Sequence, residues 1–158
     1  MQRTVLSLGF LLLASQAFAA CQVPDTIEGR EFVNAVDSNY SKQNPNAGTI
    51  MKMHFGKETY ESDILTKGFK VQGKYRYKKL SKTIGEIQAT ELYDGQTTVY
   101  SISLACLTDY TGTGVFTQLK GAIKPDQRQN TLRYTMVRDS PNKGENKVGK
   151  PDKAGKPS

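Results

Sequence analysis

Hydrophobic and polar residues alternate with a period of two through most of this chain, and no stretch carries the period of an amphipathic helix. In the clearest case, residues 69–78, the odd positions are apolar, aromatic or glycine and the even positions are Lys, Gln or Arg. The same alternation recurs around residues 51–55, 99–106 and 132–136. This pattern is typical of antiparallel strands with one buried and one solvated face. We therefore expect an all-β protein.

Turn-forming residues separate the alternating segments at regular intervals. Asp94-Gly95 is the strongest signal, because both central residues of a tight hairpin turn favour positive φ. Runs and turns together predict eight strands, near residues 29–36, 48–56, 59–65, 69–79, 84–93, 96–106, 114–120 and 130–138. Short, evenly spaced strands favour an antiparallel up-and-down meander that closes into a small barrel and leaves no free strand edge. The longest early loop, residues 37–47, is long enough to fold over a barrel mouth.

Residues 1–19 have the composition of a secretory signal peptide. A positively charged start precedes the apolar run Val5–Leu13, and small residues follow, up to Ala19. The apolar run is shorter than the about 20 residues that span a bilayer, so no transmembrane segment is expected in the mature chain. We expect a periplasmic or secreted bacterial protein. The alternative is a lipoprotein anchored through Cys21, although Phe18 stands where lipid-attachment sequences usually carry an aliphatic residue.

Cys21 and Cys106 are the two cysteines of the chain. In an oxidising compartment they are predicted to form a disulfide that closes a loop of about 85 residues. If Cys21 carries lipid instead, Cys106 is a free, buried thiol. Two cysteines and one histidine are too few for a zinc site, which takes three or four ligands, so neither a metal nor a cofactor is expected.

Charge and composition divide the rest of the chain into two parts. Residues 20–138 suit one domain with a single core. Residues 139–158 are rich in Lys, Pro and Gly and almost lack apolar side chains, so they are predicted to form a disordered basic tail. Part of the net charge of +7 lies in this tail, and the barrel itself is only mildly basic.

Glycines and alternating apolar residues carry a resemblance to a known superfamily. The pattern is Gly73-x-Tyr75-x-Tyr77, then Ile87 and Ala89, Asp94-Gly95, Tyr100-x-Ile102-x-Leu104 and Gly114-x-Phe116. It resembles a hairpin unit of MoaF-like and other lipocalin-like domains of the calycin superfamily. Residues 27–32 are similar to the opening lipocalin strand, with Phe32 in place of its tryptophan. The resemblance implies a small meander barrel, which in this superfamily often holds an apolar ligand, and it implies no catalytic residue.

The motifs of common enzyme classes are absent from the sequence, so we expect a non-enzymatic protein. There is no nucleophile elbow, no phosphate-binding loop and no paired metal-ligand motif. His54 falls on the polar face of its strand, and Glu61 and Asp63 are expected to pair with the lysine-rich strand. A barrel enzyme that uses an unidentified cavity residue is the weakest alternative.

The favoured function is binding of a small, partly apolar ligand inside the barrel. The predicted ligand-binding residues are the inward aromatic residues and one methionine: Tyr75, Tyr77, Tyr100, Phe116, Tyr134 and Met53. The alternative interpretation is that these residues fill the barrel completely and form an ordinary tyrosine-rich core. The alternative function is an extracytoplasmic interaction factor, such as an inhibitor, immunity or adhesion protein. It would bind an acidic macromolecule through loops, the tail and the outward residues Lys70, Lys74, Arg76 and Lys78. Nucleic acid is disfavoured, because the aromatic residues face inward.

Overall fold

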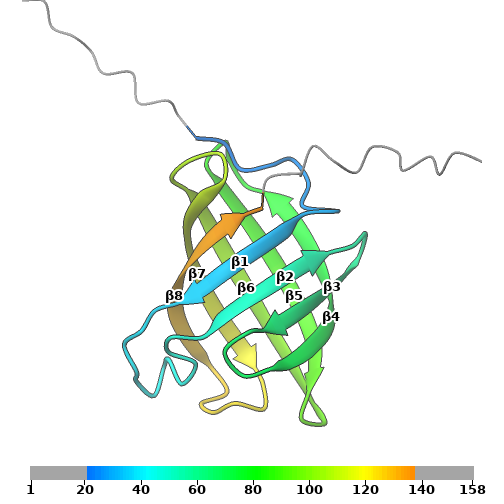
Figure 1. The fold of residues 1–158 in the computed structure, drawn as a ribbon. Helices are drawn as coiled ribbons and strands as arrows, with labels where there is room; N and C mark the ends of the chain where they lie inside the picture. Colours follow the sequence, from blue (N-terminus) through cyan, green and yellow to red (C-terminus); the bar gives the residue numbers. More distant parts are fainter. Residues whose placement is uncertain (1–20, 138–158) are drawn as a thin grey trace, which may run out of the picture.

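The computed structural model describes residues 21–137, which form a closed barrel of eight antiparallel strands (Figure 1). The predicted signal peptide, residues 1–19, and the predicted tail, residues 139–158, lie outside the described residues. The strands are β1 (Glu31–Val36), β2 (Ile50–Phe55), β3 (Thr59–Ile64), β4 (Phe69–Lys79), β5 (Ile84–Tyr93), β6 (Gln96–Cys106), β7 (Thr111–Lys120) and β8 (Arg128–Met136). Each strand pairs with its neighbour in sequence, and β1 also pairs with β8, which closes the sheet. The predicted all-β meander is confirmed.

The largest error in the predicted strand bounds is at β7, which begins at Thr111 and not at residue 114. Gly112 pairs with Tyr134 of β8, and a Cβ at Gly112 would lie 2.5 Å from the tyrosine ring. The sequence Thr111-Gly112-Thr113-Gly114 is therefore strand, although the predicted strand includes only the last of these residues. A glycine is required at position 112 because a Cβ would clash with the carbonyl oxygen of Ala105 as well as with the ring of Tyr134.

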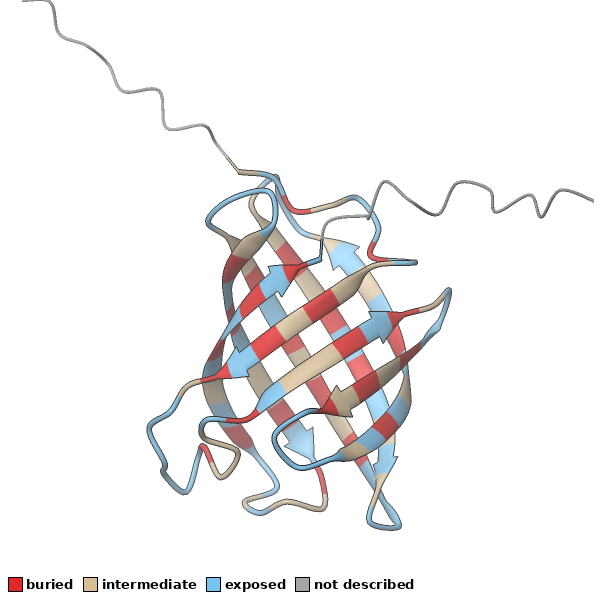
Figure 2. Cartoon of the chain, viewed as in Figure 1, coloured by how far each residue is buried: buried red, intermediate tan, exposed pale blue. Residues whose placement is uncertain are grey.

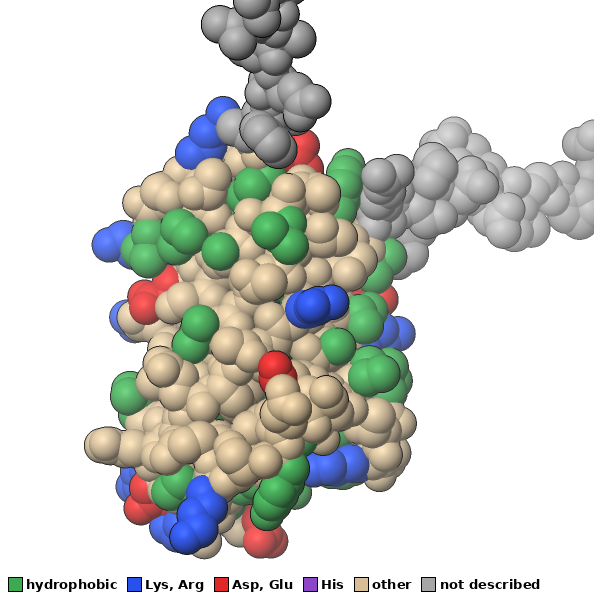
Figure 3. All heavy atoms as spheres, turned by 90° about the vertical axis from the view of Figure 1, so that its left-hand side faces the viewer, with side chains coloured by type: hydrophobic (Ala, Val, Ile, Leu, Met, Phe, Trp, Pro, Cys, Tyr) green, Lys and Arg blue, Asp and Glu red, His purple; other side chains and the backbone are tan. Residues whose placement is uncertain are grey.

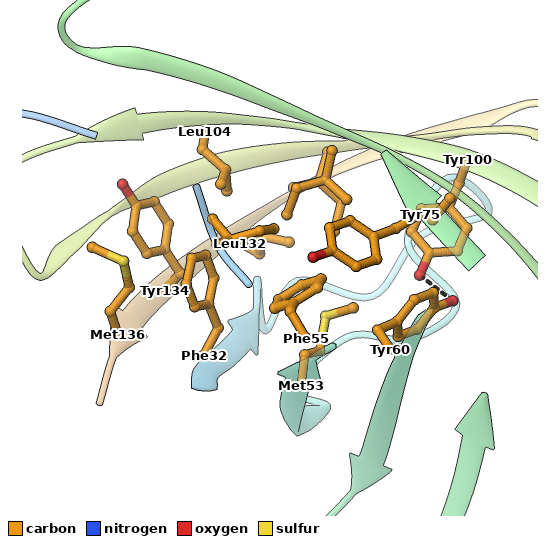
Figure 4. Packing of buried hydrophobic residues seen from close by; sticks show 14 residues of the cluster. Phe32, Met53, Phe55, Tyr60, Tyr75, Tyr100, Leu104, Leu132, Tyr134 and Met136 are labelled. Atoms are coloured by element: carbon orange, nitrogen blue, oxygen red, sulfur yellow. Dashed lines mark hydrogen bonds between the residues drawn. The ribbon is translucent and has the colours of Figure 1, made fainter. Parts of the chain in front are cut away.

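Burial alternates along the strands as the sequence pattern predicts, which gives the striped barrel wall of Figure 2. The buried side chains meet in one hydrophobic cluster inside the barrel (Figure 4). Aromatic rings make up much of it: the ring of Phe32 is stacked with Tyr134 at 5.7 Å, and its edge meets Phe55 at 5.4 Å. Phe55 in turn lies 4.9 Å from the ring of Tyr75. This part of the interior is filled by side chains.

The N-terminal segment, residues 21–30, covers one end of the barrel, and we call it the N-terminal plug (Figure 1). Val23 and Ile27 of the plug are fully buried. The amide of Val23 donates to the carbonyl of Lys82 at 3.0 Å. The hydroxyl of Tyr77, inside the barrel, donates to the carbonyl of Pro24 at 2.8 Å. The plug is therefore held both by apolar burial and by hydrogen bonds to the barrel.

A disulfide between Cys21 and Cys106 fastens the plug to the end of β6, as predicted. The two residues are 85 positions apart in sequence, and their Cα atoms lie 5.9 Å apart. Next to it, the amide of Gln22 donates to Asp109 Oδ1 at 2.9 Å. The first described residues of the chain are thereby tied to the β6–β7 loop.

The opposite end of the barrel, the loop end, carries the β1–β2, β3–β4, β5–β6 and β7–β8 connections (Figure 1). In the β1–β2 loop, the buried side chain of Asn44 donates to the carbonyls of Asp37 and Asn39. The β5–β6 connection is the predicted tight hairpin, with φ of 50° at Asp94 and 69° at Gly95. The loops at this end are therefore organised by local hydrogen bonds and turn geometry, and none of them is a plug like residues 21–30.

Candidate functional site

A cavity of about 110 Å³ lies inside the barrel toward the loop end. All eight strands contribute to its wall, and the loops add Asn46, Thr49, Lys67 and Ile123. Apolar and aromatic side chains form the larger part of the lining: Val36, Met51, Met53, Ile64, Phe69, Val71, Tyr93, Tyr100, Ile102, Phe116, Ile123 and Leu132. The strands also present polar and charged groups to it, among them Ser62, Glu91, Tyr100, Gln118 and Arg128. An apolar pocket with a few placed polar groups is the usual form of a small-molecule site.

Three of the six residues predicted to bind ligand line this cavity. They are Met53, Tyr100 and Phe116. The rings of Tyr100 and Phe116 lie side by side, with their centroids 5.0 Å apart. The structure therefore brings together residues from β2, β6 and β7, although they are up to 63 positions apart in sequence.

The other three, Tyr75, Tyr77 and Tyr134, lie outside the cavity lining, nearer the plug. The hydroxyl of Tyr75 donates to the carbonyl of Gly56 at 2.6 Å, and that of Tyr77 donates to Pro24. Burial raises the pKa of all three tyrosines, that of Tyr77 to about 12. Two of these hydroxyls are already paired with the backbone, and Tyr134 stacks on Phe32, so these residues hold the core and the plug together.

A buried hydrogen-bond chain joins β3, β5 and β6 beside the cavity. The hydroxyl of Tyr100 donates to the hydroxyl of Tyr60 at 2.6 Å, the bond dashed in Figure 4. The hydroxyl of Tyr60 donates in turn to the carboxylate of Glu91. Burial raises the pKa of the Glu91 carboxyl, and the hydrogen bond from Tyr60 opposes this effect only in part. Burial and the neighbouring carboxylate also raise the pKa of Tyr60 and of Tyr100, so both hydroxyls keep their protons.

Arg128, the first residue of β8, places a charged group in the cavity wall. Its side chain is 5 % exposed, and its guanidinium carbon lies 4.9 Å from the ring centroid of Phe116. Nε donates to Gln118 Oε1 at 3.1 Å. The amide of Gln118 donates to the carbonyls of Ile123, Pro125 and Asp126 in the β7–β8 loop. Burial lowers the pKa of Arg128, but an arginine keeps its charge at any physiological pH.

Sequence reasoning did not single out Glu91 or Arg128, although a signal for each was present. Glu91 continues the inward series of Ile87 and Ala89, so it is an acid on an otherwise apolar face. Arg128 continues the inward series of Leu132 and Tyr134 toward the N-terminus, but the predicted strand began two residues after it. In both strands the signal was an ionisable residue at a position that the alternation places inside the barrel.

The predicted basic face on β4 points outward, as expected, but it is partly neutralised. Lys70 forms an ion pair with Glu61 at 2.7 Å, and Lys78 lies opposite Glu86 in the strand register. The other two residues of the face, Lys74 and Arg76, are exposed. Exposed pairs of this kind contribute little to stability, but they reduce the local excess of positive charge.

The surface formed by β7 and β8 has no continuous apolar patch. Figure 3 shows its hydrophobic side chains in small groups separated by other atoms. Exposed residues there include Val115 and Leu119. Isolated exposed apolar side chains are normal for a protein surface and do not by themselves mark a docking site.

Residues 21–137 contain no cluster of three or more His, Cys, Asp or Glu side chains that could hold a metal ion. His54, the one histidine of the chain, is exposed on the outer face of β2, as predicted. Within the described part of the chain, no helix has the length and apolarity that crossing a bilayer would require.

Comparisons with protein-family models, with curated proteins and with solved structures find no match to this chain. The barrel is consistent with the lipocalin-like resemblance in strand number and order, and the resemblance stays at the level of the fold.

Proposed function

We propose that this protein is an exported binding protein that holds a small, partly apolar ligand inside the barrel. The observation that carries the proposal is the cavity of about 110 Å³, whose wall is mostly apolar and includes a few polar groups. A small barrel that its side chains fill completely would leave no such space. The packed aromatic cluster occupies the plug end, so the space is confined to the loop end.

The size of the cavity limits the ligand. An engineered apolar cavity of about 150 Å³ binds benzene, whereas drug-sized molecules occupy pockets of about 300–1,000 Å³. The enclosed part of the ligand is therefore about the size of one small ring or a short aliphatic chain. A larger molecule would have to extend past Asn46, Lys67 and Ile123 at the loop end.

Export is supported by the signal-like composition of residues 1–19 and by the disulfide. Stable disulfides are typical of the periplasm and of secreted proteins. Because Cys21 is bonded to Cys106, its sulfur is not available to carry a lipid in this structure, which supports the soluble form over the anchored one. Binding is favoured over catalysis because the chain's single histidine lies on the outer surface, away from the cavity.

The proposal is tested on protein purified from the exported fraction. Native mass spectrometry and solvent extraction should identify a bound small molecule. Ile102→Phe, which fills the cavity, should abolish binding of that molecule, whereas Ser103→Phe, on the outer face of the same strand, should not. A protein that carries nothing, and that binds no member of a panel of small apolar compounds, would overturn the proposal.

A further inference from the structure

Two polar groups in the cavity wall lack the partners that such groups usually have in a protein interior. The guanidinium of Arg128 is buried, and no carboxylate among residues 21–137 lies within ion-pair distance of it. The hydroxyl of Ser62, which is 4 % exposed, has no hydrogen-bond partner in the described chain. Buried charges are normally paired and buried hydroxyls are normally hydrogen-bonded. Both groups therefore point to a partner that enters the cavity.

The surroundings of Arg128 hold its guanidinium in place without neutralising it. Phe116 lies against its face, and its two hydrogen-bond acceptors, Gln118 Oε1 at 3.1 Å and Asn130 Oδ1 at 3.5 Å, are both uncharged. Gln118 is itself fixed by three bonds to loop carbonyls. A guanidinium has five N–H donors, so three remain for another acceptor. This is a positioned cation without a counter-ion among the described residues.

We propose that the ligand is a small apolar carboxylate and that Arg128 binds its charged group. This inference rests on the proposed function, because it names the chemical class of the molecule in the cavity. A planar carboxylate can accept two parallel hydrogen bonds from a guanidinium, which gives both affinity and a fixed orientation. The apolar body of the ligand then lies against the methionine and aliphatic side chains of the wall, and Ser62 offers it a further polar contact.

The balance of charge favours a carboxylate over a phosphate ester. Arg128 is a single buried positive charge, which one negative charge neutralises. A dianion would bring an excess negative charge into a cavity that also contains the Glu91 carboxyl. Lys67 lines the cavity too, but it is exposed, and its ammonium donates to Asn46 Oδ1 at 3.3 Å. Glu91 lies on β5, with two strands between it and Arg128 on β8.

The test compares benzoate with benzamide, its uncharged analogue of nearly equal shape, and with phenyl phosphate. Binding of each to the disulfide-bonded protein is measured by titration calorimetry near neutral pH. We expect benzoate to bind at least about tenfold more tightly than benzamide, the ratio that a buried charge-assisted hydrogen bond supplies. This comparison uses the unaltered protein, so it does not depend on whether a variant folds.

Two variants of Arg128 and one control variant connect the preference to Arg128. Arg128→Gln should abolish the preference for benzoate, whereas Arg133→Gln, an exposed position on the same strand, should retain it. Arg128→Lys, which keeps the charge without the planar fork, should retain part of it.

The possible outcomes separate this inference from the proposed function. Equal binding of benzoate and benzamide would overturn the inference and leave the proposed function standing. Tighter binding of phenyl phosphate would overturn the choice of a carboxylate. A preference that persists in Arg128→Gln would overturn the role of Arg128. If no probe and no small apolar compound binds, both proposals fail.

Discussion

Gly73 provides the space that the ring of Tyr60 occupies on the neighbouring strand. The two residues pair directly between β3 and β4, and a Cβ at Gly73 would lie 2.6 Å from Tyr60 Cε1 and 2.7 Å from its hydroxyl. Tyr134 and Gly112 are paired in the same way between β7 and β8. In both pairs a glycine allows a tyrosine to lie flat along the inner wall, which brings the hydroxyl of Tyr60 to Glu91.

Gly73→Ala should destabilise the barrel, because the added methyl group would lie 2.6 Å both from the ring of Tyr60 and from the carbonyl oxygen of Thr90. Overpacking of this kind typically lowers the free energy of unfolding by about 1–3 kcal/mol, which urea denaturation measures. In a Tyr60→Leu background the same substitution should cost less, since the flat ring is gone. An equal cost in both backgrounds would show that the clash with the Thr90 carbonyl, and not the ring, is the obstacle.

Tyr100→Phe should remove one bond of the buried chain while leaving Tyr60 bonded to Glu91. The expected loss in free energy of unfolding is about 1 kcal/mol, the usual contribution of one hydrogen bond. Tyr40→Phe is the matched control, because the side chain of Tyr40 is 78 % exposed. If the two variants have the same stability, the Tyr100–Tyr60 bond contributes nothing.

Glu91→Gln should change how stability depends on pH. Burial raises the pKa of Glu91 in the folded protein, so the folded state disfavours the ionised carboxylate. The contribution of Glu91 is therefore fully present below its unfolded-state pKa and is lost as the pH rises through its folded-state pKa. Relative to Glu91→Gln, the native protein should lose stability as the pH rises above about 4, the ordinary pKa range of a glutamate carboxyl.

The comparison of Glu91→Gln with the native protein is made by urea denaturation at several pH values. Glu58→Gln, at an exposed position, controls for the removal of one negative charge. A stability difference between Glu91→Gln and the native protein that stays constant with pH would contradict the prediction.

The double variant Cys21→Ser/Cys106→Ser should be much less stable than the native protein. A cross-link across 85 residues restricts the unfolded chain, and chain-entropy arguments assign such a loop about 4 kcal/mol. Thermal unfolding of the native protein with and without reductant should show the same difference. A melting temperature unaffected by either change would mean that the plug is held by Val23, Ile27 and its hydrogen bonds alone.

The strands could be predicted from the sequence because the inward and outward faces differ at nearly every position. In β4, for example, the inward residues Val71 and Tyr75 alternate with exposed Gln72 and Lys74. The β5–β6 turn could be predicted because Asp94-Gly95 suits one turn type. The disulfide could be predicted because the chain has two cysteines and a signal-like start.

The site could be predicted only in part, because alternation gives the face of a residue and not its depth along the barrel axis. Tyr75 and Tyr100 both point inward, but the first lies nearer the plug and the second lines the cavity. That difference depends on residues 21–30, which cover one end and carry no periodic signal. The depth of each tyrosine therefore follows from the three-dimensional closure of the barrel and from no local pattern.

The N-terminal plug closes one end of the barrel, so the interior can be reached only from the opposite end. The loop residues Asn46, Lys67 and Ile123 border the cavity at the loop end, so a ligand would enter and leave through that end. A change in the β7–β8 loop that widens the opening at this end should then raise the association and the dissociation rate constants together, with little effect on Kd. Breaking the disulfide at Cys21 would instead loosen the N-terminal plug at the closed end of the barrel.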